Sequence, residues 1–237
     1  MSIRRKGPHG SKGSGGGKKG KSGRRRDPSQ RVKTAQGRKT SSTQWLSRQL
    51  NDPYVAAAQS EGMRSRAAYK LAELDDRFHF LKPGQRILDL GAAPGGWTQI
   101  ALDRGARVVA IDKSEMDALP GATVLELDFM DDDAPGLIAQ ALDGPADVIL
   151  SDMAPQLTGH AGTDHLRLMG LLEAVFDFAL ANLSAGGCLV AKVFQGGTEE
   201  GLLKRMKPHF TSLRHAKPPA SRAQSSEIYV IGKGFKP

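Results

Sequence analysis

The feature that most constrains the fold is an apolar segment that runs directly into a glycine-rich turn, Ile87-Leu-Asp-Leu-Gly-Ala-Ala-Pro-Gly-Gly-Trp97. In doubly wound α/β folds, a strand, such a turn and a following helix form the ligand-binding edge of the sheet. Glycine permits unusual backbone angles and lets a ligand approach the main chain. The spacing G-x-x-x-G-G differs from the dinucleotide fingerprint G-x-G-x-x-G, and Pro94 lacks the N–H that a pyrophosphate would use. On its own, the turn is equally compatible with a structural role.

The rest of the chain alternates short β-rich runs with helical stretches. Ala67, Leu71, Leu74 and Phe78 step by four, three and four residues, which predicts one face of a helix over Arg66–Phe78. The expected strands are Arg86–Leu90, Arg107–Ile111, Thr123–Leu127, Asp147–Ser151, Leu189–Phe194, a weak strand near Leu213, and Ile228–Ile231. The expected helices between them are Trp97–Arg104, Leu137–Leu142, His165–Leu183 and Thr198–Lys207. This alternation predicts one α/β domain with a mostly parallel sheet and helices on both faces.

The positive charge of the chain lies in its first fifth. The 237 residues carry a formal charge of +9, but residues 1–44 hold fourteen Lys/Arg and one acid, Asp27, and are +13. Residues 45–237 are therefore −4. The Gly/Lys/Arg/Ser-rich segment has too little apolar surface to offset its ordering entropy, so residues 1–44 are predicted to be a disordered basic tail. It could bind a polyanion without sequence specificity, or serve only as a solubilising extension.

Composition excludes several classes of protein. No apolar run approaches the roughly 18–20 residues of a membrane span, and the charged N-terminus lacks the apolar segment of a secretory signal. The single cysteine, Cys188, cannot form an internal disulfide or a thiolate cluster, and we expect it to pack as a small buried group. The histidines show no metal-ligand spacing, so no metal is expected. We therefore expect a cytoplasmic protein.

Three successive predicted strands end in an aspartate. Asp112 closes the second strand, 21 residues after Gly91, and Asp128 and Asp152 follow the third and fourth strands. Carboxyl ends of parallel strands meet at one edge of a sheet, where an acid can accept both ribose hydroxyls of a nucleoside. Each acid alone could be an ordinary solvated residue. Together, beside a turn without a phosphate cradle, they suit a cationic nucleoside such as S-adenosylmethionine.

Five motifs, in order, resemble the FtsJ/RrmJ family of bacterial 23S ribosomal RNA 2′-O-methyltransferases. They are Ser65-Arg-Ala-Ala-Tyr-Lys-Leu71, Asp89-Leu-Gly-Ala-Ala-Pro-Gly-Gly-Trp97, Ser151-Asp-Met-Ala-Pro155, Lys192-Val-Phe-Gln-Gly196 and Ser226-Glu-Ile-Tyr-Val230. The resemblance runs from about Trp45 to the C-terminus and does not cover the tail. It implies a Rossmann-like, seven-stranded S-adenosylmethionine-dependent methyltransferase domain over residues 45–237.

The resemblance implies a catalytic tetrad of two lysines and two acids: Lys70, Asp152, Lys192 and Glu227. The sequence lends partial support, because Lys192 lies mid-strand, where a buried and unpaired ammonium is costly. A lysine on an edge strand that reaches solvent is the alternative. Lys70 follows Arg66 by one helical turn, an arrangement that suits either phosphates or a solvated face. We expect Lys192 to be the general base, Lys70 to add positive charge, and Asp152 and Glu227 to orient these groups.

By the same resemblance, the expected cofactor contacts are Gly95, Trp97, Asp112, Asp128 and Asp152. Asp112 would take the ribose hydroxyls and Asp128 would lie near the adenine amino group. Trp97 opens the helix after the turn and could equally be a core aromatic. No metal is required, because methyl transfer from a sulfonium already has a good leaving group.

The implied substrate is a uridine in the A-loop of 23S ribosomal RNA, presented within the large ribosomal subunit to a monomeric enzyme. Phosphates could be held by Arg64, Arg66, Lys70 and Arg222, although a solvated surface explains each equally well. Three other functions remain open at this point. They are a 2′-O-methyltransferase of transfer RNA or messenger RNA caps, a catalytically silent ribosome assembly factor, and a nicotinamide-dependent dehydrogenase.

Overall fold

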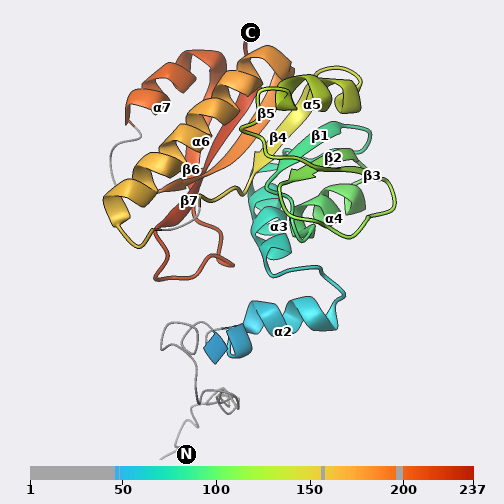
Figure 1. Cartoon of the computed structure of the whole chain (residues 1–237), viewed down its shortest axis with the longest axis vertical. Coiled ribbons are helices and arrows are strands. Elements are labelled where there is room, and N and C mark those ends of the chain that lie inside the picture. The colour runs from blue at the N-terminus through green and yellow to red at the C-terminus, as the bar shows by residue number, and fades with distance from the viewer. Residues whose placement is uncertain (1–45, 48, 156–157, 196–199) are drawn as a thin grey trace, which may run out of the picture.

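A computed structural model describes residues 46–47, 49–155, 158–195 and 200–237. The predicted basic tail lies outside these residues. Within the described part of the chain, seven strands form one sheet with the order β3-β2-β1-β4-β5-β7-β6 (Figure 1). The strands are β1 (Arg86–Leu90), β2 (Arg107–Asp112), β3 (Ala122–Glu126), β4 (Ala146–Ser151), β5 (Leu183–Phe194), β6 (Phe210–Ala216) and β7 (Glu227–Phe235). The predicted mostly parallel, seven-stranded sheet is confirmed.

Helices cover both faces of this sheet, as expected. One apolar core packs α3 (Ala67–Phe78) and α4 (Gly96–Asp103) against it, and includes Ile87 of β1. The other packs α5 (Ala134–Leu142), α6 (Ala161–Asn182) and α7 (Glu200–Met206) against the opposite face, and includes Leu88 and Leu90. Neighbouring residues of β1 thus alternate between two cores, which is why its sequence reads as a continuous apolar run.

Several element boundaries differ from the sequence prediction. Helix α5 begins at Ala134, three residues earlier than expected, because Pro135 fits the first helical turn, where no N–H is needed. Strand β5 begins at Leu183 rather than Leu189, and the weak strand near Leu213 spans seven residues. Helix α7 begins at Glu200; the start predicted at Thr198 lies outside the described residues.

A short helix near the start of the predicted domain, α2 (Pro53–Ser60), was not predicted. Asp52 caps it by accepting a hydrogen bond from Tyr54 N at 3.1 Å. It has few buried residues of its own, so its sequence lacks the apolar periodicity that marks a packed helix. Polar contacts hold α2 to the rest of the domain, including a hydrogen bond from the Tyr54 hydroxyl to Glu73 of α3 at 3.0 Å.

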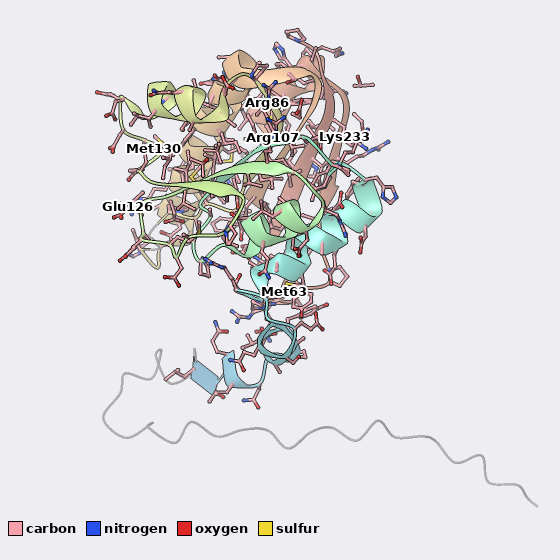
Figure 2. All side chains as sticks on the ribbon, turned by 90° about the vertical axis from the view of Figure 1, so that its right-hand side faces the viewer. Met63, Arg86, Arg107, Glu126, Met130 and Lys233 are labelled. Atoms are coloured by element: carbon pink, nitrogen blue, oxygen red, sulfur yellow. The ribbon has the colours of Figure 1, made fainter. Side chains whose placement is uncertain are left out.

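The strand order positions the candidate site. From β1 the chain leaves to α4 on one face, whereas from β4 it leaves to α6 on the other, so the loops diverge between these two neighbouring strands. In open α/β sheets, ligands bind in the crevice at this point. Figure 2 shows Arg86 and Arg107, the first residues of β1 and β2, at the opposite end of the sheet from Met63. The following residue, Arg64, contacts the glycine-rich turn.

No helix among the described residues is long and apolar enough to cross a membrane. No group of three or more His, Cys, Asp or Glu side chains in the same part of the chain is arranged to hold a metal ion. Cys188 is buried in the core, and burial raises the pKa of its thiol to about 12, in keeping with a packing role.

Candidate active site

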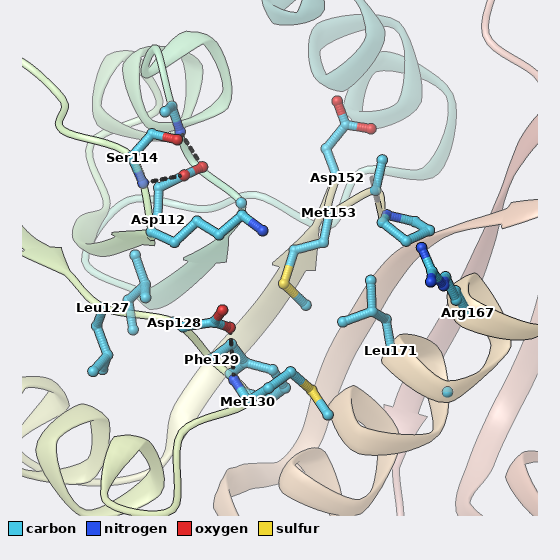
Figure 3. Close-up of a pocket in the computed structure, with 17 residues that line it drawn as sticks. Asp112, Ser114, Leu127, Asp128, Phe129, Met130, Asp152, Met153, Arg167 and Leu171 are labelled. Carbon is cyan, nitrogen blue, oxygen red and sulfur yellow. Dashed lines mark hydrogen bonds between the residues drawn. The ribbon is translucent and has the colours of Figure 1, made fainter. Parts of the chain in front are cut away.

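A cavity of about 640 Å³ opens at the carboxyl ends of the central strands. The glycine-rich turn after β1 forms one wall, and the segment after β4 forms another (Figure 3). These two walls approach closely at Gly91, where a Cβ would lie 2.7 Å from Met153 Cγ. Gly91 also has φ +76°, so glycine is required there for both space and conformation.

Asp112 and Asp128 line one end of the cavity. Asp112 Oδ2 accepts a hydrogen bond from Ala93 N at 3.0 Å and Oδ1 accepts one from Ser114 N at 2.8 Å, which joins the end of β2 to the glycine-rich turn. Asp128 Oδ1 accepts from Met130 N at 3.0 Å. Apolar side chains lie between the two acids, so this end presents carboxylates against an apolar wall (Figure 3).

Gly95 and Trp97 are described in the structure but do not line this cavity. Gly95 has φ +104° and precedes α4, and a Cβ there would lie 2.8 Å from Leu119 Cδ1. Trp97 is 3% exposed, and its Nε1 donates to Ala67 O at 2.9 Å. Its side chain therefore occupies the core position that sequence analysis left open as the alternative.

Lys70, Asp152, Lys192 and Glu227 converge beside the same cavity, although they come from four different segments. Lys70 Nζ lies 3.7 Å from Asp152 Oδ2 and 3.6 Å from Glu227 Oε2. Lys192 Nζ lies 3.1 Å from Asp152 Oδ1 and 3.9 Å from Glu227 Oε1, and donates to Asp152 O at 2.6 Å. Both lysine side chains are at most 10% exposed. Their positive charges are balanced by the two carboxylates of the cluster, Asp152 and Glu227.

Tyr229 lies in the middle of this cluster and was missed by sequence analysis. Its hydroxyl donates to Asp152 Oδ1 at 2.7 Å and accepts from Lys70 Nζ at 3.1 Å, and its ring packs 5.5 Å from that of Trp97. One signal could have found it. Tyr229 is two residues after Glu227 and therefore shares its face of the strand, and the β5–β7 register pairs it with Lys192.

Burial and charge shift the pKa values of two residues of the cluster. Burial alone would raise the pKa of Asp152, but the ammonium groups of Lys192 and Lys70 hold it below its usual range. Burial and the Asp152 charge together raise the pKa of Tyr229 well above its usual value. Asp152 is therefore a carboxylate and Tyr229 a neutral donor at physiological pH.

Asp89, at the centre of β1, is a further buried acid that sequence analysis did not assign. Burial raises its pKa to about 7, and the charges of Asp152 and Asp112 act in the same direction. Thr98 of α4 donates to Asp89 Oδ2 at 2.7 Å, while Oδ1 has no partner. The side chain thus links β1 to α4 just behind the glycine-rich turn.

Each of the four cations proposed to hold phosphates has a partner within the protein. Arg64 donates to the carbonyls of Pro94, Asp117 and Ala118, and Lys70 belongs to the cluster. Arg66 Nε lies 3.1 Å from Asp52 Oδ2 without an aligned hydrogen bond, and Arg66 also donates to Ala220 O. Arg222 lies 3.4 Å from the same Asp52 oxygen.

Comparisons with known proteins identify the family of the chain. Residues 63–235 match the family described as FtsJ-like methyltransferase. The chain belongs to the FtsJ-like methyltransferase family. A protein named ribosomal RNA large subunit methyltransferase E, from Paramagnetospirillum magneticum, is 57% identical over 225 residues, which cover 92% of each chain. Its namesake from Rhodospirillum rubrum is 59% identical over 218 residues, covering 89% of this chain and 83% of that one.

Solved structures give the same result. A crystal structure described as that of a putative ribosomal RNA methyltransferase from Plasmodium falciparum matches with a TM-score of 0.66 and 32% identity, covering 73% of this chain and 98% of that one. The family resemblance and the fold expected from the motifs are confirmed, and the chain is a methyltransferase. The shared fold explains why the cluster and the cavity meet at the divergence of the β1 and β4 loops.

Proposed function

We propose that this protein transfers a methyl group from S-adenosylmethionine to the ribose 2′-hydroxyl of a uridine in the A-loop of 23S ribosomal RNA, on the large ribosomal subunit. The observation that carries the proposal is the Lys70–Asp152–Lys192–Glu227 cluster at the edge of a carboxylate-lined cavity. The family and the names of the relatives from Paramagnetospirillum magneticum and Rhodospirillum rubrum support the reaction class and the ribosomal RNA substrate.

The cavity fits the cofactor. Its volume of about 640 Å³ is sufficient for a nucleoside of this size, and its lining combines three aspartates with apolar side chains. Asp112 would accept the ribose hydroxyls, Asp128 would lie near the adenine amino group, and Asp152 would face the positive charge. Gly95 and Trp97 do not line this cavity, so as cofactor contacts they rest on the family resemblance alone. When bound, S-adenosylmethionine supplies a methyl group on a sulfonium, and the neutral thioether that remains after transfer is a good leaving group.

The cluster would position the ribose hydroxyl and remove its proton. We assign Lys192 Nζ as the acceptor. A lysine accepts a proton only in its neutral form, so the Lys192 ammonium would first release a proton to solvent, and the neutral amine would then take the proton of the 2′-hydroxyl as its oxygen bonds to the methyl carbon and the carbon–sulfur bond breaks. Asp152 fixes the orientation of that amine through its carbonyl at 2.6 Å and its carboxylate at 3.1 Å. Glu227 lies between the two lysines, and Lys70 adds positive charge near the developing alkoxide.

A 2′-hydroxyl target requires RNA, because DNA lacks this group. Residues 45–237 form the methyltransferase domain in this proposal, and residues 1–44, with a charge of +13, bind the ribosome electrostatically. Deletion of residues 1–44 should weaken binding to large subunits and flatten its salt dependence, because fewer counterions are released. Affinity for S-adenosylmethionine should not change, and a loss would show that the domain begins earlier. The protein would act as a cytoplasmic monomer.

The test is in vitro methylation of large ribosomal subunits purified from cells that lack this protein. The methylated nucleotide is identified by nuclease digestion and mass spectrometry, with transfer RNA, capped RNA and free 23S ribosomal RNA assayed in parallel. We expect 2′-O-methylation of one A-loop uridine. Preferential methylation of transfer RNA or a cap would overturn the substrate assignment. The absence of single-turnover methylation of any of these RNAs would favour a silent assembly factor, and tighter binding of NAD than of S-adenosylmethionine would favour a dehydrogenase.

A further inference from the structure

Segment 217–226, which leads into β7, is attached to α3. Ala220 is held by both of its backbone groups: its N–H donates to Glu73 Oε2 at 2.7 Å, and its carbonyl accepts a hydrogen bond from Arg66. Arg66 is the N-cap residue of α3, and Glu73 lies within the helix. Lys70 follows Arg66 by one helical turn, so the helix that carries Lys70 also holds this segment.

Asp52, which precedes α2, pairs with an arginine of each part. Its Oδ2 lies 3.1 Å from Arg66 Nε and 3.4 Å from Arg222 Nε, so one carboxylate oxygen joins the start of α3 to segment 217–226. Its other oxygen, Oδ1, accepts from Tyr54 N and caps α2. The Asp52 side chain is 8% exposed, so solvent and salt screen these pairs only weakly. The family match covers residues 63–235 and therefore does not include Asp52.

Further hydrogen bonds connect Arg222 to the catalytic cluster, because Glu227 follows it by five residues. Within this stretch, Lys217 Nζ donates to the carbonyls of Ala223 at 3.2 Å and Ser225 at 2.5 Å. Ser225 Oγ accepts from the backbone N–H of Glu227 at 3.2 Å. The segment thus has a defined shape between Arg222 and β7, and a displacement of Arg222 would be passed on to Glu227.

We propose that Asp52 is a positioning residue for methyl transfer. Through Arg66 it holds the start of α3, and through Arg222 it holds the segment before β7. These two elements carry Lys70 and Glu227, whose Nζ and Oε2 atoms lie 3.6 Å apart in the cluster. Asp52 does not line the cavity, so it acts on the reaction through this geometry and not by contact with the cofactor. This inference rests on the proposed function, because it assigns Asp52 to the methyl-transfer step.

Helix capping alone does not require the charge of Asp52. A cap needs one oxygen to accept from Tyr54 N, and asparagine caps helices about as well as aspartate. The charge is needed by Arg66 and Arg222, because a shielded ion pair that loses one partner leaves an uncompensated charge. Without the carboxylate the two guanidinium groups would separate and shift segment 217–226. A shift of about 1 Å at a catalytic group can lower the rate by about a hundredfold.

The experiment uses the full chain with Asp52→Asn, which keeps an oxygen for the cap and removes the charge. Methylation of large ribosomal subunits from cells that lack this protein gives kcat and KM, and calorimetry gives the Kd for S-adenosylmethionine. We expect kcat at saturating substrates to fall about tenfold, with the cofactor Kd unchanged. Glu61→Gln is the matched control, because Glu61 is an exposed acid at the end of α2 that accepts from the Tyr69 hydroxyl at 2.8 Å. It should match the wild type.

Two further measurements separate positioning from a general loss of stability. If Asp52 acts through Arg222, the losses in kcat should not add, and Asp52→Asn combined with Arg222→Gln should be no slower than the slower single variant. Hydrogen exchange needs no substrate. The Ala220 amide should exchange faster in Asp52→Asn, while the amides of the central strand β4 keep their wild-type protection.

Three results would overturn the proposal: a wild-type kcat in Asp52→Asn, additive losses in the double variant, or an equal loss of protection at Ala220 and in β4. If Asp52→Asn does not fold, Arg222→Gln decides, because it breaks the same ion pair from the other side. That variant should then show the lower kcat and the faster Ala220 exchange, and wild-type values for both would overturn the proposal. Failure of the proposed function would instead appear as an inactive wild type.

Discussion

The two ends of the cavity are built in different ways. At the cofactor end, Asp112 and Asp128 bond to backbone N–H groups of nearby turns, two of them only two residues further along the chain. At the catalytic end, side chains bond to one another across the fold, as in the contact between Lys70 and Tyr229, 159 residues apart. The cofactor end is therefore set by local turns, and the catalytic end by the pairing of β5 with β7.

This difference separates the expected effects of substitutions. A change at the cofactor end should alter affinity for S-adenosylmethionine with less effect on the chemical step. A change in the cluster should lower kcat and leave cofactor binding nearly intact. Variants that violate this separation would show that the two ends act as one unit.

The largest effect is expected for Lys192→Ala, which removes the proposed proton acceptor. Single-turnover methylation of large subunits should fall by about 10³-fold, within the range of general base catalysis, while the Kd for S-adenosylmethionine stays nearly unchanged. Lys192→Arg is the matched variant, because arginine keeps the charge beside Asp152 but does not lose a proton in proteins. It should be as inactive as the alanine variant, and full activity in either protein would remove Lys192 from this role.

Asp112→Ala should act at the other end of the cavity. It removes a carboxylate that orders the glycine-rich turn and is proposed to accept the ribose hydroxyls, so the Kd for S-adenosylmethionine should rise about 10- to 100-fold. At saturating cofactor, kcat should recover most of its wild-type value. Asp112→Asn keeps one acceptor oxygen, so its Kd for S-adenosylmethionine should lie between those of the wild type and Asp112→Ala. A loss of kcat that saturating cofactor does not restore would contradict the separation.

Tyr229→Phe sharpens the description of the catalytic end. It removes the hydrogen bond to Asp152 but keeps the ring against Trp97, so kcat should fall about tenfold with cofactor affinity unchanged. The folded-state pKa of Asp152 is lowered, so its carboxylate is lost as pH falls through that value. Loss of the Tyr229 hydroxyl raises this pKa, and the acidic limb of the kcat profile should move to higher pH.

A control for this variant is Tyr69→Phe, which removes a hydroxyl bonded to Glu61 outside the cluster. Its kcat and pH profile should match those of the wild type. An unchanged acidic limb in Tyr229→Phe, or a shift of the same size in Tyr69→Phe, would argue against the contact between Tyr229 and Asp152.

Asp89→Asn should change stability more than activity. The folded-state pKa of Asp89, about 7, lies above its unfolded value, so the free energy of unfolding of the wild type should decrease as pH rises from about 4 to 7. The contribution is on the order of 4 kcal/mol. Asn removes this charge but can still accept from Thr98, so denaturant titrations at pH 5 and 7.5 should show a flatter pH dependence. As a control, Asp103→Asn changes an exposed acid, and the free energy of unfolding of this variant should depend on pH as it does in the wild type.

Sequence analysis could predict the parts of the site that depend on neighbouring residues. The turn from Gly91 and the acids after three strands follow from local patterns, and their meeting at one edge follows from a parallel sheet. The tetrad itself came from the family motifs. Tyr229 and the Asp52 contacts were missed, because the first depends on an antiparallel register and the second on an unpredicted helix. The period of a strand places Tyr229 on the face of Glu227, but the partners across the fold depend on strand register and helix packing, which neighbouring residues do not specify.

The most direct test is to map 2′-O-methylation in 23S ribosomal RNA from cells whose chromosomal copy encodes Lys192→Ala, compared with the wild type and with Lys204→Ala, an exposed lysine of α7. The proposed mechanism predicts that the A-loop uridine loses its methyl group in the Lys192→Ala cells and keeps it in the other two. Retention of that methyl group in cells carrying only Lys192→Ala would contradict the assignment of the reaction to this cluster.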